Sequence, residues 1–166
     1  MKSQLPCSEA RKLIGSRHTR TFFLLTLIAG GNYAESVFGT WKVKTSRSTF
    51  EGVRAPKSLT VRIEPHAKGE VFTLDSVESD GRATSSSSIL YFDSTPRGFQ
   101  DFDCVGTQSS RRLDSGTIEI RRHCASSDGI WLVRHPTEKS KEMMIDITEK
   151  RRPGPNLDWR LVLEKQ

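Results

Sequence analysis

From Gly39 onward, apolar and polar residues alternate with a period close to two, in short runs separated by turn residues. Trp41 and Val43 alternate with lysines, and residues 59–63 alternate Leu, Val and Ile with Thr and Arg. This alternation is typical of half-buried β-strands, and no amphipathic helical pattern interrupts it. The sequence therefore predicts an all-β fold.

Turn signals separate the runs along the chain. Asp80-Gly81 is a strong hairpin signal, and the segments 114–116 and 152–155 are rich in Asp, Gly and Pro. Consecutive hairpins of this kind make an antiparallel up-and-down meander. Closing the meander into a small barrel of about 8–10 strands removes its exposed edges, whereas a two-sheet sandwich is the alternative that uses nearly the same positions.

The alternation also predicts which side chains point into the interior. The expected inward residues are Trp41, Val43, Leu59, Val61, Ile63, Phe72, Leu74, Ile118, Ile120, Trp131, Val133, Met143, Ile145, Ile147, Trp159, Leu161 and Leu163. In the strand expected over residues 83–92, the serine run 85–88 has little apolar content. We expect the centre of that strand to be exposed or to line a polar cavity.

Residues 1–34 precede this domain, and their composition predicts an N-terminal leader segment. The apolar run 21–28 follows a basic segment, and residues 29–31 (Ala-Gly-Gly) supply the small side chains that a signal peptidase requires. Cleavage after Ala34 is a second possibility. We expect an export signal and a mature barrel domain over residues 35–166 outside the cytoplasm, with membrane contact only during export. A buried helix or a start site assigned too early is the alternative.

The net charge of +6 lies mostly in this leader. Five basic residues and one acid give residues 1–34 a charge of +4, which leaves 6 − 4 = +2 for residues 35–166. Aromatic residues that could stack on bases are not interleaved with the later arginines. We therefore expect no nucleic-acid partner. The leader residues counted are Lys2, Glu9, Arg11, Lys12, Arg17 and Arg20.

Export would leave Cys104 and Cys124 as an even pair in an oxidising compartment. They flank the hairpin expected from strands 108–113 and 117–123. If Ser115-Gly116 is a two-residue turn, paired positions sum to 231 and the two cysteines are offset by three positions. A bulge at Gly106 would bring them together as a disulfide; two unrelated thiols are the alternative.

Residues 38–42 (Phe-Gly-Thr-Trp-Lys) resemble the Gly-x-Trp opening of lipocalin-like proteins. Together with residues 55–61, Asp80-Gly81, residues 117–119 and residues 164–166, they resemble a group of small, exported, uncharacterised bacterial proteins. The resemblance implies a lipocalin-like barrel in which Gly39 and Trp41 close one end and a basic residue of the last strand packs across the Trp. Arg160 is the candidate for that role, and Lys165 is the alternative.

No catalytic, metal-binding or cofactor-binding motif emerges from the residues. The sequence has no Gly-x-Ser-x-Gly, P-loop or dinucleotide fingerprint, and its histidines are scattered without a ligand spacing. Asp101 and Asp103 share one face of a strand expected over residues 99–104, where they could hold a cation or act as paired carboxylates; solvated surface acids are the alternative. We expect no enzyme, no metal and no cofactor.

Two functional hypotheses remain. In the first, a monomeric exported barrel binds or sequesters a small apolar or amphipathic molecule, with Trp41, Tyr91, Trp131 and Met143 as candidate ligand contacts. Trp41, Trp131 and Met143 are of types that more often serve as ordinary core residues than as ligand contacts.

The second hypothesis is a fully packed barrel that binds an anionic partner, such as a membrane surface or a cell-wall polymer. Its candidate contacts are Arg111, Arg121 and Arg151, in and near the arginine-rich hairpin. Because neighbouring strand residues point to opposite faces, each arginine pair supplies one member to a given side. A solvated face is the alternative.

Overall fold

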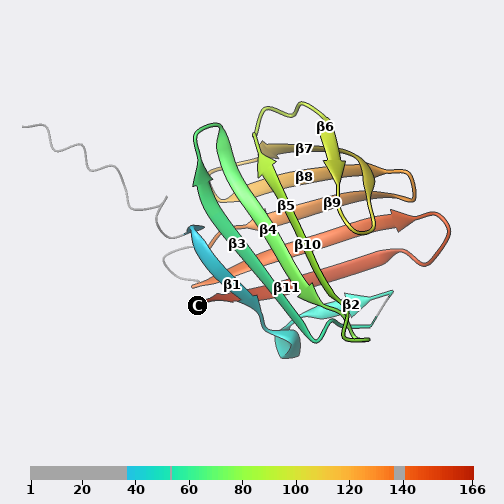
Figure 1. Cartoon of the computed structure of the whole chain (residues 1–166). Helices are drawn as coiled ribbons and strands as arrows, with labels where there is room; N and C mark the ends of the chain where they lie inside the picture. Colours follow the sequence, from blue (N-terminus) through green and yellow to red (C-terminus); the bar gives the residue numbers. More distant parts are fainter. Residues whose placement is uncertain (1–36, 53, 137–140) are drawn as a thin grey trace, which may run out of the picture. The chain divides into compact units, whose positions relative to one another are not determined.

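The computed structural model describes residues 37–52, 54–136 and 141–166, so the leader expected over residues 1–34 lies outside the described residues. The described chain forms one antiparallel sheet of eleven strands and a short 3-10 turn, η1 (Thr45–Arg47) (Figure 1). None of the helices in these segments has the length and apolar content needed to cross a bilayer. The strands are β1 (Gly39–Val43), β2 (Thr49–Glu51), β3 (Ser58–His66), β4 (Gly69–Val77), β5 (Ala83–Leu90), β6 (Arg97–Gln100), β7 (Val105–Arg112), β8 (Thr117–Cys124), β9 (Ser127–Arg134), β10 (Glu142–Arg151) and β11 (Leu157–Lys165).

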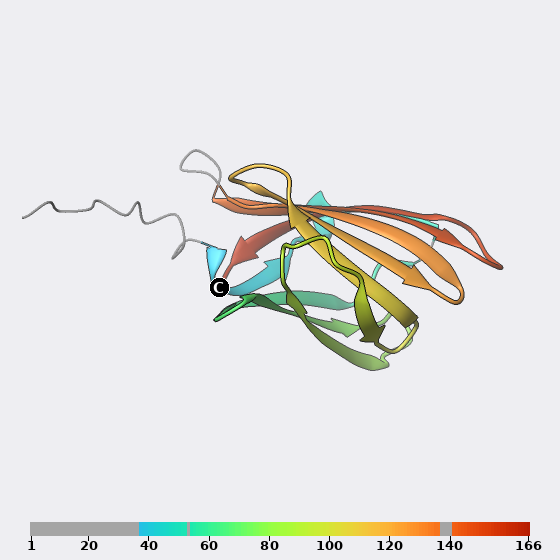
Figure 2. The same ribbon diagram turned by 90° about the horizontal axis from the view of Figure 1, so that it is seen from above.

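The strand order confirms the antiparallel meander and the nearly closed barrel. The order is β5-β4-β3-β1-β11-β10-β9-β8-β7-β6, with β2 paired to β11 outside this path. The first long strand, β1, therefore lies between β3 and the last strand, β11. In Figure 2 the green strands β3–β5 face the orange and red strands β9–β11 across the interior.

Side chains and one isolated backbone bridge join the two remaining edges of the described sheet. After β5, Asp93 forms a β-bridge with Arg111 of β7, and the Ser94 N–H donates to the Ser110 carbonyl at 3.0 Å. Gln108 Nε2 of β7 donates to Ser88 Oγ of β5 at 2.9 Å, and Arg112 Nη2 contacts Glu70 Oε1 at 2.6 Å. The backbone N–H of Phe92 donates to Ser110 Oγ at 3.2 Å. These polar contacts cover strand edges that would otherwise expose unpaired backbone groups.

The interior contains every residue that the alternation assigned to it. All belong to one apolar cluster, in which Leu74 and Trp159 are partly buried and the others are buried. Trp41 is 1% exposed, and its indole Nε1 donates to the Val37 carbonyl oxygen at 2.8 Å. The cluster also includes Val37, Leu90 and Leu157, which the alternation did not select.

Lys165, not Arg160, is the basic residue that lies across Trp41. Its Nζ is 5.6 Å from the ring centroid, and the two residues are directly paired between β1 and β11. Gly39, at φ +125°, leaves room for this side chain, because a Cβ at residue 39 would stand 3.2 Å from Lys165 Cε. Arg160 lies on the outer face and pairs with Asp146 at 2.7 Å.

The register of the β7–β8 hairpin differs from the expected one. Paired positions sum to 230, as in Arg112↔Ile118 and Gly106↔Cys124, so the expected sum of 231 was wrong. The Leu113 N–H donates to the Thr117 carbonyl, which makes Asp114–Gly116 a three-residue loop. The Asp114 carboxylate accepts the Gly116 N–H at 2.7 Å and thereby stabilises the longer turn.

His135 is a buried histidine that follows β9, and it makes the stability of the fold depend on pH. Burial lowers its pKa from 6.5 to about 4, with the positive charge of Arg112 acting in the same direction and Asp114 opposing it. The folded protein therefore keeps His135 neutral between these pH values, whereas the unfolded chain takes up a proton.

We expect the free energy of unfolding to fall between pH 7 and pH 4 by roughly 2–3 kcal/mol more in the wild type than in His135→Gln. The extra stability is fully present above about pH 6.5 and is lost as the pH falls towards 4. Urea unfolding at several pH values measures it. Parallel pH curves for the two proteins would contradict the prediction.

Candidate ligand cavity

A cavity opens at one end of the barrel interior. It has a volume of about 150 Å³ and is lined by strands from around the barrel. Its apolar surface includes Leu59, Ile147 and Leu161, and the indoles of Trp131 and Trp159. Trp159 and Leu157 lie in the first half of β11, whereas Lys165 and its partner Trp41 lie at the other end of that strand.

Small residues on the inner face leave this space unfilled. Thr84 and Ser86 of β5 and Ser127 and Gly129 of β9 line the cavity. The serine run thus behaves as expected: Ser85 and Ser86 both contribute to a partly polar cavity, and the exposed Ser85 hydroxyl donates to Asp75 at 2.6 Å. Larger residues at these inward positions would fill the volume.

Arg122 of β8 is the charged residue held most deeply in the cavity wall. Its side chain is 10% exposed, and its guanidinium lies 4.4 Å from the ring centroid of Phe99 and 4.2 Å from that of Trp131. Arg122 Nε donates to Gln108 Oε1 at 3.0 Å, and Nη1 donates to Asp101 Oδ2 at 3.3 Å. The two flanking rings fix the plane of the guanidinium.

Desolvation lowers the pKa of Arg122 to about 10, and the negative charges of Asp101 and Glu149 oppose this shift. The pKa remains far above neutral pH, so Arg122 carries a positive charge inside the barrel at pH 7. A buried charge of this kind is tolerated only when it is paired and hydrogen-bonded.

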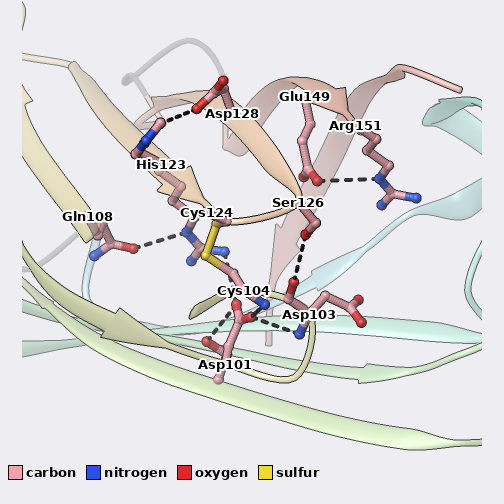
Figure 3. The surroundings of a disulfide bond; sticks show 12 residues. Asp101, Asp103, Cys104, Gln108, His123, Cys124, Ser126, Asp128, Glu149 and Arg151 are labelled. Atoms are coloured by element: carbon pink, nitrogen blue, oxygen red, sulfur yellow. Dashed lines mark hydrogen bonds and ion pairs between the residues drawn. A yellow bond between two sulfur atoms is a disulfide. The ribbon is translucent and has the colours of Figure 1, made fainter. Parts of the chain in front are cut away.

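Asp101 reaches Arg122 from a tight turn, not from a strand. β6 ends at Gln100 and residues 101–104 lie outside any strand, so the expectation that Asp101 and Asp103 share one face of a strand over residues 99–104 was wrong. Asp101 Oδ1 accepts the backbone N–H groups of Asp103 and Cys104 at 3.0 and 2.8 Å. One carboxylate oxygen thus shapes the turn (Figure 3), while the other contacts Arg122.

A disulfide attaches this turn to β8. Cys104 and Cys124 are bonded, with their Cα atoms 5.2 Å apart, and both residues line the cavity. Gly106 lies directly opposite Cys124, and a Cβ at residue 106 would overlap the carbonyl oxygen of His123. The glycine therefore allows β7 and β8 to approach closely beside the disulfide.

A second ion pair lies on the β10 side of the cavity. Arg151 Nε contacts Glu149 Oε1 at 3.3 Å, and both side chains are half-buried (Figure 3). Arg151 therefore lies at the cavity. The other two arginines of the anionic-partner hypothesis, Arg111 and Arg121, are on the outside.

On that outer face, Arg111 and Arg121 both bind Glu119, each at 2.7 Å. These two guanidinium groups lower the pKa of Glu119, so its negative charge offsets one of theirs. The structure therefore does not bring Arg111, Arg121 and Arg151 together on one surface.

Of the four candidate ligand contacts, only Trp131 lies at the cavity. Trp131 lines the cavity, whereas Trp41 and Met143, which are 1% and 0% exposed, are packed in the core and are not among the lining residues. Tyr91 lies outside the cavity lining, where Arg97 stacks at 4.0 Å from its ring centroid.

Sequence reasoning did not single out Arg122. A signal was available, because Arg122 lies two and four residues after Ile120 and Ile118, which were assigned to the interior. A charged residue on an otherwise apolar inward face marks a candidate polar site.

Within the described segments, no group of three or more His, Cys, Asp or Glu side chains is placed to hold a metal ion. No protein-family model matches the sequence, and a search of curated proteins found no match.

Gly106→Ala should destabilise the protein by about 2–3 kcal/mol, because the new methyl group has no space against the β8 backbone. Gly98→Ala is the matched control, since a Cβ at residue 98 meets no atom within 4 Å. Urea unfolding of the two variants measures the difference. Equal stabilities would show that β8 can move away at little cost.

Replacing Cys104 and Cys124 together by Ser should lower the free energy of unfolding by about 3 kcal/mol, the loop-closure contribution for a separation of 20 residues. Reduced wild-type protein should unfold at the same urea concentration as the double variant. Coincident unfolding curves for oxidised and reduced wild type would contradict this expectation.

Proposed function

We propose that the protein is an exported, non-catalytic barrel that binds one small amphipathic molecule, or one end of a longer one, in this cavity. The observation that carries the proposal is the composition of the lining: an apolar surface with two indoles meets a buried, charged arginine. Apolar walls supply affinity in such sites, and a few fixed polar groups orient the ligand.

The cavity volume limits the size of the bound group. A protein cavity of about 150 Å³ is known to accommodate a single benzene ring. The proposal therefore concerns a ligand, or a ligand terminus, about the size of one six-membered ring.

Two further observations support export and binding without catalysis. The Cys104–Cys124 disulfide is typical of oxidising compartments. Asp101 and Glu149, the two lining acids nearest the buried charge, are engaged by Arg122 and Arg151. Carboxylates held in ion pairs are poorly suited to proton transfer, so the proposal includes no catalytic step.

Titration with toluene, followed through the indole N–H signals in ¹H–¹⁵N NMR spectra, tests the binding proposal. Trp131 and Trp159 line the cavity and should shift in a saturable way. Trp41 is packed at the other end of the barrel and should not shift. Three tryptophans occur in the chain, so the spectrum contains its own control.

Gly129→Leu should abolish this response or weaken toluene binding at least tenfold. A Cβ at Gly129 would make ordinary contacts, at 3.6 Å from Glu149 Cγ and 3.7 Å from Trp131 Nε1, so the enlarged side chain enters the cavity without a backbone clash. Gly98→Leu adds the same side chain in open space on β6. Unsaturable shifts, or equal binding by both variants, would refute the proposal.

A further inference from the structure

The polar part of the cavity allows the chemical class of the ligand to be narrowed, on the premise that the cavity binds a ligand as proposed above. Arginine has five N–H donors. Arg122 uses Nε for Gln108 and Nη1 for Asp101, while Nη2 has no hydrogen-bond partner among the described residues. Arg122 therefore has donor capacity left for a ligand atom in the cavity.

The charge of Arg122 is already balanced by the protein. Asp101 contacts it directly, and Glu149 also acts on it electrostatically. Counting all the lining residues, the four carboxylates of Glu78, Asp101, Asp103 and Glu149 face the two guanidinium groups of Arg122 and Arg151, a net charge of 2 − 4 = −2.

A ligand carboxylate beside Arg122 would enter this negative surrounding and lie close to Asp101. Like charges at short range in a poorly hydrated site repel strongly. A ligand ammonium group at the same position would instead be repelled by the positive guanidinium group. Asp101, the counter-ion of Arg122, could not move to the ammonium group, because two backbone N–H groups hold its carboxylate within the 101–104 turn. Neither sign of charge suits the position.

We infer that the cavity selects an uncharged amphiphile whose hydroxyl, carbonyl or ether oxygen accepts a hydrogen bond from Arg122, and that Asp101 excludes carboxylates. Arg122 and Asp101 together form a neutral polar anchor. The ring or short alkyl part of the ligand lies against Trp131, Ile147 and Leu161. Asp101 acts by repelling ligand carboxylates through its negative charge, so it determines specificity without itself binding the ligand.

Four probes that share one aromatic ring test this inference at pH 7 and fixed ionic strength: toluene, benzyl alcohol, benzoate and benzylamine. Dissociation constants come from the Trp131 and Trp159 indole shifts. The wild type should bind benzyl alcohol at least tenfold more tightly than benzoate or benzylamine. If either charged probe binds as tightly as the alcohol, the inference is overturned.

Asp101→Asn is the decisive variant, because its amide oxygen can still accept the backbone N–H groups that shape the turn. It removes one negative charge beside Arg122, so the affinity for benzoate, measured relative to the affinity for toluene, should be at least tenfold higher than in the wild type. Asp75→Asn is the matched control, since it removes the same charge from the outer face of β4, where Asp75 binds Ser85. Unchanged benzoate binding in Asp101→Asn refutes the role of Asp101.

The double variant Arg122→Met with Asp101→Asn removes the donor without leaving an unpaired acid. Relative to Asp101→Asn, it should lower the ratio of benzyl alcohol affinity to toluene affinity about five- to tenfold, the effect of losing one hydrogen bond. Equal losses for both probes would mean that Arg122 only supports the cavity wall.

The results separate this inference from the proposed function. If toluene fails to shift Trp131 and Trp159 in the wild type, both ideas fail. If toluene binds but benzyl alcohol, benzoate and benzylamine bind equally well, the cavity is a ligand site, and only the inference about an uncharged polar group fails. Well-dispersed spectra of each variant show that it has folded.

Discussion

The pairing of the first strand with the last is the constraint on which the rest of the structure depends. β1 lies between β3 and β11, so the ends of the described domain are joined in the middle of the sheet and not left at its edges. Trp41 sits at this junction, opposite Val61 on one side and Lys165 on the other. The sheet then curves until its two edges meet through side chains and one isolated backbone bridge, so that the barrel is nearly closed.

Given that interior, the difference between its two ends follows from side-chain volume. Near Trp41 the inward positions hold large apolar residues such as Ile63, Met143 and Leu163, which are almost completely buried. Towards the other end, β5 and β9 contribute Ser86 and Gly129. Because a barrel has a fixed circumference, small inward residues cannot be compensated by closer strand approach, and they leave a cavity.

Much of the fold could be read from the sequence, since a half-buried strand repeats its pattern every two residues. The inward residues predicted from that period are found in the core. The same period of two places Lys165, and not Arg160, on the same face of β11 as Leu161 and Leu163, and Lys165 is the residue that lies across Trp41. The hairpin register was misjudged by one because the Asp114 side chain stabilises a three-residue loop, which alternation cannot distinguish from a two-residue turn.

The cavity could not be read in this way, because alternation tells which face a residue occupies but not its height along the barrel. Height depends on the stagger of each strand against the next, and this stagger brings Arg122 of β8, Trp131 of β9 and the turn at Asp101 to one level. The disulfide and the glycine opposite Cys124 then hold that turn against β8. The buried arginine is stable only because these separate segments meet there, so the elements that fix the fold at this end are also those that give the cavity its polarity.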